Sequence, residues 1–197
     1  MEITKLSDLI KSDLDRFTQT FALRGQAFSR CRVFWESFVF KAGFQAVFLY
    51  RISHWLHERK WNYTAWFVTR LNIAWTGAEI EYNAHIGPGM FIAHPVGIVI
   101  GRGTVMGKNV TLFQGVSFGV KSWHPAAIGK FPRVEDNCYF FAGSAVMGNV
   151  RIGSESVVAA HAVVVCDVPE GSLAAGVPAK IYPGKGKDAI ASWSRAV

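Results

Sequence analysis

The sequence predicts a mainly β protein, in which a β-helix of six-residue repeats follows an N-terminal α-helical domain. Three observations predict this fold: helical periodicity in the first 77 residues, hydrophobic residues every six positions from residue 80, and the long persistence of that repeat. We place the helical domain at residues 1–77, the β-helix at 78–182 and a C-terminal tail at 183–197.

The N-terminal region has the spacing of amphipathic helices. From Thr4 to Phe21, apolar residues lie three or four positions apart, which places them on one face of a helix. The stretches 33–60 and 61–75 continue this pattern, with Gly43 as a break or a close-packing point. Five of the seven tryptophans lie in this region. We attribute them to helix packing or a subunit interface, with contact to a membrane surface as the alternative.

A period of six residues is typical of a triangular coil. Each short face sends one large side chain inward before the chain turns a corner, and three faces make a coil of about eighteen residues. The repeats therefore provide roughly five coils. The predicted inward residues are Ile80, Ile86, Ile92, Ile100, Met106, Leu112, Phe118, Val134, Phe140, Val146, Ile152, Val158 and Val164.

Two features mark the corners of this coil. Glycines directly follow several inward residues, where we expect the chain to bend tightly: Gly87, Gly101, Gly107, Gly119 and Gly153. The segment 120–133 interrupts the repeat, which then resumes unchanged, so we expect this segment to protrude as a loop from one corner.

Composition excludes several classes of protein. The formal charge is +7, with 11 Lys/Arg against 6 Asp/Glu in residues 1–77, but no nucleic-acid-binding motif accompanies the charge. The N-terminus lacks a signal core, and charged residues interrupt the most apolar stretch, 42–56, before it could span a bilayer. The three separated cysteines fit neither a disulfide frame nor a zinc site. We expect a cytoplasmic protein without a metal, either free or at the inner face of the membrane.

Four separated motifs resemble the bacterial serine O-acetyltransferases and cover nearly the whole chain: Gly43–Leu56 (GFQAVFLYRISHWL), Thr76–Ile80 (TGAEI), His94–Gly101 (HPVGIVIG) and Ala174–Ile181 (AAGVPAKI). This resemblance implies a left-handed parallel β-helix. It also implies homotrimers with active sites between neighbouring β-helices, or hexamers paired through the helical part. Acetyl-CoA would lie along the coil edge as acyl donor, and the acetyl group would pass directly to a hydroxyl.

His94 is the candidate general base, because an alcohol needs one to become a nucleophile near neutral pH. It lies at a two-residue slip in the repeat, so we expect it to project from a distorted corner. In the family pattern this position is the catalytic histidine. Glu79, fifteen residues earlier, falls where the family has an aspartate that orients the histidine ring, and Glu81 is the rival for this role.

Four further residues are candidates for binding the acyl donor. Backbone amides near Gly119 could stabilise the oxyanion of the tetrahedral intermediate. By the resemblance, Ala142 and Ala160 fall where the pantetheine arm of CoA lies against small side chains, and Lys180 where a cation meets a CoA phosphate.

The acceptor site departs from the family pattern. Ala93 replaces the aspartate before the catalytic histidine, and Phe131 replaces a loop histidine, so charged partners for an amino acid are missing. A neutral, aromatic pocket suits a sugar ring, and Trp123 and His124 could line it. We therefore expect an acetyl-CoA-dependent O-acetyltransferase acting on a sugar of a surface polysaccharide or its precursor, as in the capsule-associated branch. The alternatives are serine O-acetylation for cysteine synthesis and a non-catalytic β-helix scaffold.

Overall fold

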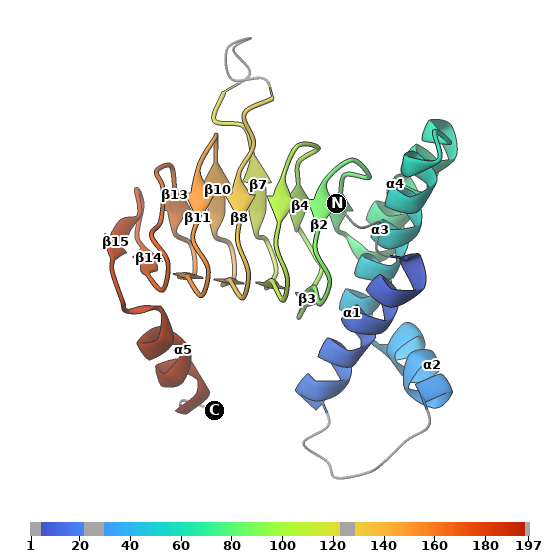
Figure 1. The fold of residues 1–197 in the computed structure, drawn as a ribbon, viewed down its shortest axis with the longest axis horizontal. Coiled ribbons are helices and arrows are strands. Elements are labelled where there is room, and N and C mark those ends of the chain that lie inside the picture. The colour runs from blue at the N-terminus through green and yellow to red at the C-terminus, as the bar shows by residue number, and fades with distance from the viewer. Residues whose placement is uncertain (1–4, 22–29, 123–128, 196–197) are drawn as a thin grey trace.

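The structure is a computed structural model that describes residues 5–21, 30–122 and 129–195. Figure 1 shows four helices gathered at the N-terminal end of a long prism of strands, with α3 and α4 side by side. Among the described residues, no helix has both the length and the apolar character needed to cross a membrane. The helices are α1 (Leu6–Phe21), α2 (Arg30–Phe40), α3 (Ala42–Glu58) and α4 (Asn62–Thr76).

The prism has three faces, each a ladder of very short strands. Face 1 contains β1 (Glu79–Ile80), β4 (Val99–Ile100), β7 (Ser117–Gly119), β10 (Ala145–Met147) and β13 (Val163–Val164). Face 2 contains β2 (His85–Ile86), β5 (Val105–Met106), β8 (Arg133–Val134) and β11 (Arg151–Ile152). Face 3 contains β3 (Phe91–Ile92), β6 (Thr111–Leu112), β9 (Tyr139–Phe140), β12 (Val157–Val158), β14 (Leu173–Ala175) and β15 (Lys180–Tyr182).

Neighbouring strands pair in parallel on all three faces, except that β15 returns antiparallel to β14. The result is the predicted left-handed parallel β-helix. Figure 1 shows the described parts of segment 120–133 leaving the prism between β7 and β8, and a further helix, α5 (Gly186–Arg195), near the last coils. The sequence had left α5 as part of a tail.

All thirteen predicted inward residues are buried. Strand register stacks them in columns; on face 1, for example, Ile80, Ile100 and Phe118 are successive partners. A second inward position, two residues before each of these, was missed because its occupants vary in size and polarity from coil to coil. Its buried apolar members are Ala78, Ala84, Met90, Ile98, Val110, Val116, Cys138, Val150 and Ala162.

The corner glycines serve a different purpose from the one predicted. Positive φ angles occur elsewhere, for instance at Gly97 and Gly115, with φ of +73° and +69°. At Gly107, which follows an inward residue, a Cβ atom would lie 2.2 Å from Asp136 Oδ1 in the next coil. A Cβ at Gly87 would lie 2.5 Å from the carbonyl oxygen of Gly107. These glycines therefore provide clearance between coils rather than a tight bend.

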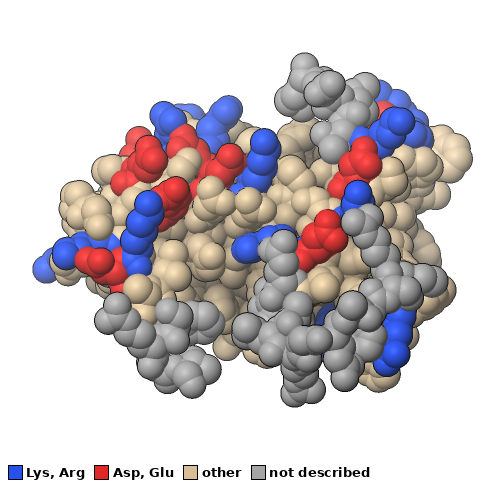
Figure 2. Space-filling view, turned by 60° about the horizontal axis from the view of Figure 1, so that its bottom comes forward, with Lys and Arg blue, Asp and Glu red and all other residues tan. Residues whose placement is uncertain are grey.

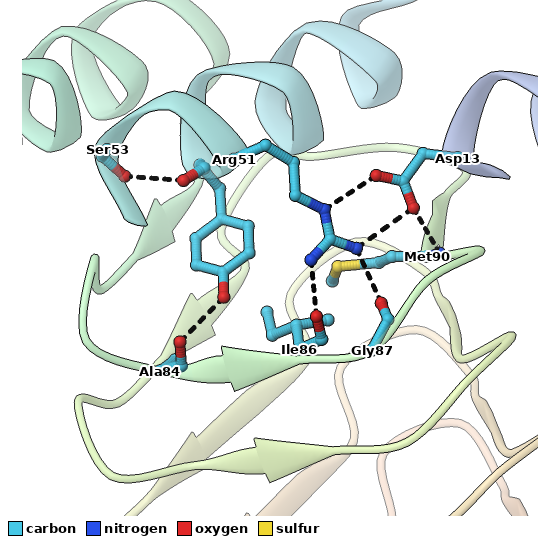
Figure 3. A network of polar contacts seen from close by, with 8 residues as sticks. Asp13, Arg51, Ser53, Ala84, Ile86, Gly87 and Met90 are labelled. Atoms are coloured by element: carbon cyan, nitrogen blue, oxygen red, sulfur yellow. Dashed lines mark hydrogen bonds and ion pairs between the residues drawn. The ribbon is translucent and has the colours of Figure 1, made fainter. Parts of the chain in front are cut away.

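A buried polar network joins the helices to the first coil (Figure 3). The Arg51 guanidinium on α3 forms an ion pair with Asp13 on α1 at 2.8 Å, and both side chains are 1% exposed. Arg51 also donates to the carbonyls of Ile86 and Gly87, while Asp13 accepts the backbone N–H of Met90. One ion pair thus satisfies backbone groups at the edge of the β-helix, where no further coil supplies partners.

Gly43 is a close-packing point, as expected. A Cβ atom there would lie 1.9 Å from the carbonyl oxygen of Ile92 in β3, so α3 approaches the first coil at backbone distance.

At the opposite end of the prism, Figure 2 shows acidic and basic side chains intermingled.

Candidate active site

His94 lies on a widened corner between face 3 and face 1. Residues 93–98 join β3 to β4, two residues more than the segment 113–116 that joins β6 to β7 one coil later. Two backbone bonds hold the wider corner: Gly97 donates to Gly77 at 3.0 Å, and Gly115 donates to Val96 at 3.0 Å. The His94 side chain is exposed, whereas Pro95 next to it is buried. The predicted slip in the repeat is therefore a real widening that displays the histidine.

Strand register continues the His94 position along one edge of the prism. Counting three residues from the paired positions Phe91, Thr111, Tyr139 and Val157 gives His94, Gln114, Ala142 and Ala160. At the far end of this edge, β15 pairs Lys180 with Ala175. The structure thus brings His94, Ala142, Ala160 and Lys180 to one edge, which we call the His94 edge.

Glu79 begins β1, in the coil that precedes His94. Its Cα partner is Val99, the first residue of β4 after the His94 corner. Because Ile80 points inward, the half-buried Glu79 side chain points outward beside that corner. Glu81 follows Ile80 and so lies nearer the other end of face 1, which favours Glu79 over its rival. In the described part of one chain, no hydrogen bond joins the Glu79 carboxylate to the His94 ring.

Two predicted site residues lie at a different corner. Gly119 ends β7, and Phe131 packs where face 1 meets face 2: a Cβ at Gly103 would lie 2.3 Å from Phe131 Cδ2. A single chain therefore does not combine Phe131 with Ala93, which is half-buried beside His94. The pocket expected from these two residues does not form within one chain. Trp123 and His124 lie outside the described residues.

Two side chains on the His94 edge escaped the sequence analysis. Gln114 is exposed and lies on the same corner one coil later, where the backbone bond from Gly115 to Val96 places it opposite Val96. His161 is exposed, with φ of 57°, and its ring lies so close to Gly143 that a Cβ there would be 2.5 Å from Nδ1. Aligning whole coils, rather than only the inward residues, would have found both. Among the described residues, no group of three His, Cys, Asp or Glu side chains could hold a metal ion.

The sequence is similar to several known enzymes. No family model matches the sequence. The chain is 32% identical over 180 residues to the serine acetyltransferase of Bacillus subtilis, covering 91% of this chain and 78% of that protein. It is 36% identical over 151 residues to the serine acetyltransferase of Helicobacter pylori strain J99, covering 74% and 84% respectively.

Solved structures agree. The serine acetyltransferase of Neisseria gonorrhoeae superposes with a TM-score of 0.79 at 28% identity, over 92% of this chain and 67% of that one. A serine acetyltransferase in complex with CoA gives a TM-score of 0.78 at 27% identity, over 90% and 69%.

A left-handed β-helix that displays a histidine on a widened corner, together with these relatives, defines an acetyl-CoA-dependent acyltransferase. The identity and coverage go further than this class. The chain belongs to the serine acetyltransferase family. The relatives give no support to the capsule-associated branch that the sequence had suggested.

Proposed function

We propose that this chain transfers the acetyl group of acetyl-CoA to the hydroxyl of L-serine, with His94 as the general base. The observation that carries this proposal is the match to serine acetyltransferases over most of their length, with His94 exposed on the widened corner. This corrects the emphasis of the sequence analysis, which put a sugar first and serine second.

His94 would act by moving one proton. A neutral imidazole nitrogen takes the proton of the serine hydroxyl while the oxygen attacks the thioester carbon. The carbon–sulfur bond then breaks, and the imidazolium returns the proton to the departing CoA thiolate. Exposure of His94 supports this role, because the ring must meet both substrates.

Glu79 would position the base. A carboxylate beside a histidine fixes the ring tautomer and stabilises the imidazolium formed during transfer. The outward side chain of Glu79 supports this role, and a hydrogen bond to His94 could form once substrates are bound, since such bonds often tighten only in the complex.

The His94 edge fits an extended acyl donor. Ala142 and Ala160 are small, so a pantetheine arm could approach the backbone closely, and the exposed Lys180 could meet a phosphate. CoA would supply the activated acetyl group at the His94 end of this edge. Backbone amides near Gly119 keep their proposed role toward the oxyanion.

Assembly would bring the two corners together. Gly119 and Phe131 lie at the opposite end of face 1 from His94 within one chain. A homotrimer, or a hexamer built from two trimers, could place the corner that holds them beside His94 of a neighbouring subunit. The separation of the proposed residues supports an active site shared between chains.

A sugar hydroxyl is the second candidate acceptor, and Ala93 favours it. The residue before His94 is the neutral Ala93, whereas an amino acid needs charged partners for both its ammonium and its carboxylate group.

An acceptor assay separates these proposals. CoA release from acetyl-CoA would be followed with L-serine and with a panel of free and lipid-linked sugars. We expect turnover with L-serine; turnover with sugars alone would instead support the second candidate. If acetyl-CoA binds but no acceptor is acetylated, the chain acts as a non-catalytic scaffold and both proposals fail. An Ala93→Asp variant sharpens the result, because it should lower KM for L-serine if the amino acid is bound beside His94.

A further inference from the structure

Helix α4 buries polar residues and exposes large apolar ones, the reverse of an ordinary surface helix. Its polar residues Thr69, Asn72 and Thr76 are buried. The Asn72 amide donates to the carbonyl of Ala46 on α3 at 2.9 Å, and the Thr76 hydroxyl donates to the carbonyl of Asn72 at 2.9 Å. The buried side of α4 thus consists of small or polar side chains, and the Asn72 amide is hydrogen-bonded to α3.

The outward side of α4 is aromatic. Five of its large apolar residues are between 45% and 92% exposed and follow one another at helical spacing, so they form one stripe: Tyr63, Trp66, Phe67, Leu71 and Trp75. We call this stripe, with Trp61 at the helix start, the aromatic face: Trp61, Tyr63, Trp66, Phe67, Leu71 and Trp75. Packing of the chain does not account for it, since these side chains contribute little to the core.

The aromatic face continues onto α2. The indole N–H of Trp75 donates to the Gln45 side chain at 3.0 Å, and the Gln45 amide donates to the carbonyl of Phe38 at 2.6 Å. Val39 and Phe40, at the end of α2, are exposed as well. The exposed apolar surface therefore extends beyond a single helix, and large patches of this kind mark binding surfaces.

Positive charge accompanies the aromatic face. Residues 59–76 contain three basic residues, Arg59, Lys60 and Arg70, and no acidic one. The Arg70 guanidinium lies over the Trp66 ring, 5.6 Å from its centroid, and Arg59 lies over Trp55 at 3.7 Å. Glu58, at the end of α3, is the acidic residue next to this group in sequence. The surface thus combines tryptophan, tyrosine and basic side chains.

We propose that the aromatic face docks on the surface of an anionic lipid bilayer. Tryptophan and tyrosine favour the headgroup region, and basic residues beside them are attracted to anionic lipids. A helix of 15 residues is about 22 Å long and would lie flat in this region. Contact between two aromatic faces fits less well, because residues 58–76 of each copy carry three basic residues against one acidic residue, Glu58, so like charges would meet.

Docking would hold the active-site corner near the membrane. Helix α4 ends at Thr76, and the carbonyl of Gly77, which caps the helix, accepts the backbone N–H of Gly97 in the His94 corner. A bilayer under α4 would therefore keep His94 within reach of acceptors at the lipid surface. The docking proposal is independent of the acceptor, because the aromatic face binds lipid in the absence of either substrate.

Vesicle flotation of the full-length protein tests the proposal. Vesicles of phosphatidylcholine alone would be compared with vesicles that contain phosphatidylglycerol, at physiological salt. We expect the wild type to bind the anionic vesicles. The double variant Trp66→Ser/Phe67→Ser should bind at least about tenfold more weakly, because it lacks two aromatic side chains that would be buried in the bilayer. Arg70→Gln should weaken binding to anionic vesicles only. Val165→Ser, on an exposed apolar residue of the β-helix, is the matched control.

Three results would overturn the docking proposal: failure of the wild type to float with anionic vesicles, equal binding to neutral vesicles, or unchanged binding of the double variant. Light scattering on the same variants identifies the competing occupant. If the wild type does not bind vesicles and the oligomer of the double variant differs in mass from that of the wild type, the aromatic face is a contact between subunits. Acetyl transfer to soluble acceptors is measured separately, so loss of docking and loss of the proposed activity are distinguishable.

Discussion

In the β-helix, large apolar side chains point inward and stack coil upon coil, whereas the helical region also buries an ion pair and the Asn72 amide, and exposes Trp61, Trp66 and Trp75. In the β-helix every coil packs on the next in the same way, so each coil offers its neighbours the same surface. The helical region meets the end of that stack, where the carbonyls of Ile86 and Gly87 need partners from elsewhere. Buried charge is thus found where the repeat ends, at Asp13 and Arg51.

The largest effect should come from the buried ion pair. Asp13→Ala leaves the Arg51 charge buried without its partner, which should lower the free energy of unfolding by about 3–5 kcal/mol. Urea unfolding measures the change, and Asp15→Ala, on an exposed carboxylate of the same helix, should be nearly neutral. If the Asp13 variant is as stable as the wild type, the network does not stabilise the junction.

Two leucines compare the regions directly. Leu112 is fully buried in the β-helix, and Leu71 belongs to the aromatic face of α4. Leu112→Ala should cost about 2–5 kcal/mol through lost burial and a cavity, while Leu71→Ala should change stability by less than about 0.5 kcal/mol. Equal losses at both positions would mean that α4 is covered when the protein folds, for instance by another subunit.

Two glycines test whether clearance between coils is the requirement. Gly107→Ala would drive a Cβ to 2.2 Å from Asp136, whereas at Gly119 the nearest atom is Met147 Sδ at 3.6 Å, an ordinary contact. We expect Gly107→Ala to lower stability by about 1–3 kcal/mol and Gly119→Ala to be tolerated, as read from thermal melts. Equal losses at both glycines would favour chain bending over clearance as the reason for glycine, and tolerance at Gly107 would contradict the clearance explanation.

The smallest effect concerns a surface ion pair of the β-helix. The hydrogen bond from Arg151, with a further one from the Ser154 backbone, lowers the pKa of Glu135 below its ordinary value. A lowered pKa in the folded state stabilises the protein above the unfolded-state pKa, and this stabilisation is lost as the pH falls below about 4.5. The stability difference between wild type and Glu135→Gln should therefore shrink on acidification. A constant difference would contradict this pKa shift.

The same contrast explains what the sequence could predict. The six-residue spacing identifies the inward residues of each coil from local sequence alone, so all thirteen were predicted without knowledge of any contact between distant residues. The Asp13–Arg51 pair was not predicted because it joins two helices, and Arg51 had been interpreted only as an interruption of an apolar stretch.

Site residues could likewise be placed within the repeat but not outside it. His94 could be found because it breaks the repeat, and register then places Ala142 and Ala160 on its edge. Phe131 could not be placed, because segment 120–133 has no period to fix its direction. Its ring packs against Gly101 and Gly103 instead of facing Ala93. An interruption of the repeat indicates where function lies but not which corner it serves.

The most direct test of this account is the rate of acetyl transfer by His94→Ala, measured as CoA release with the best acceptor. Loss of a general base should lower kcat by about 10²–10⁴-fold, with acetyl-CoA binding and the melting temperature unchanged. His85→Ala, on an exposed histidine of face 2, is the matched control and should retain full activity. If His94→Ala turns over as fast as the wild type, the widened corner is not the catalytic centre.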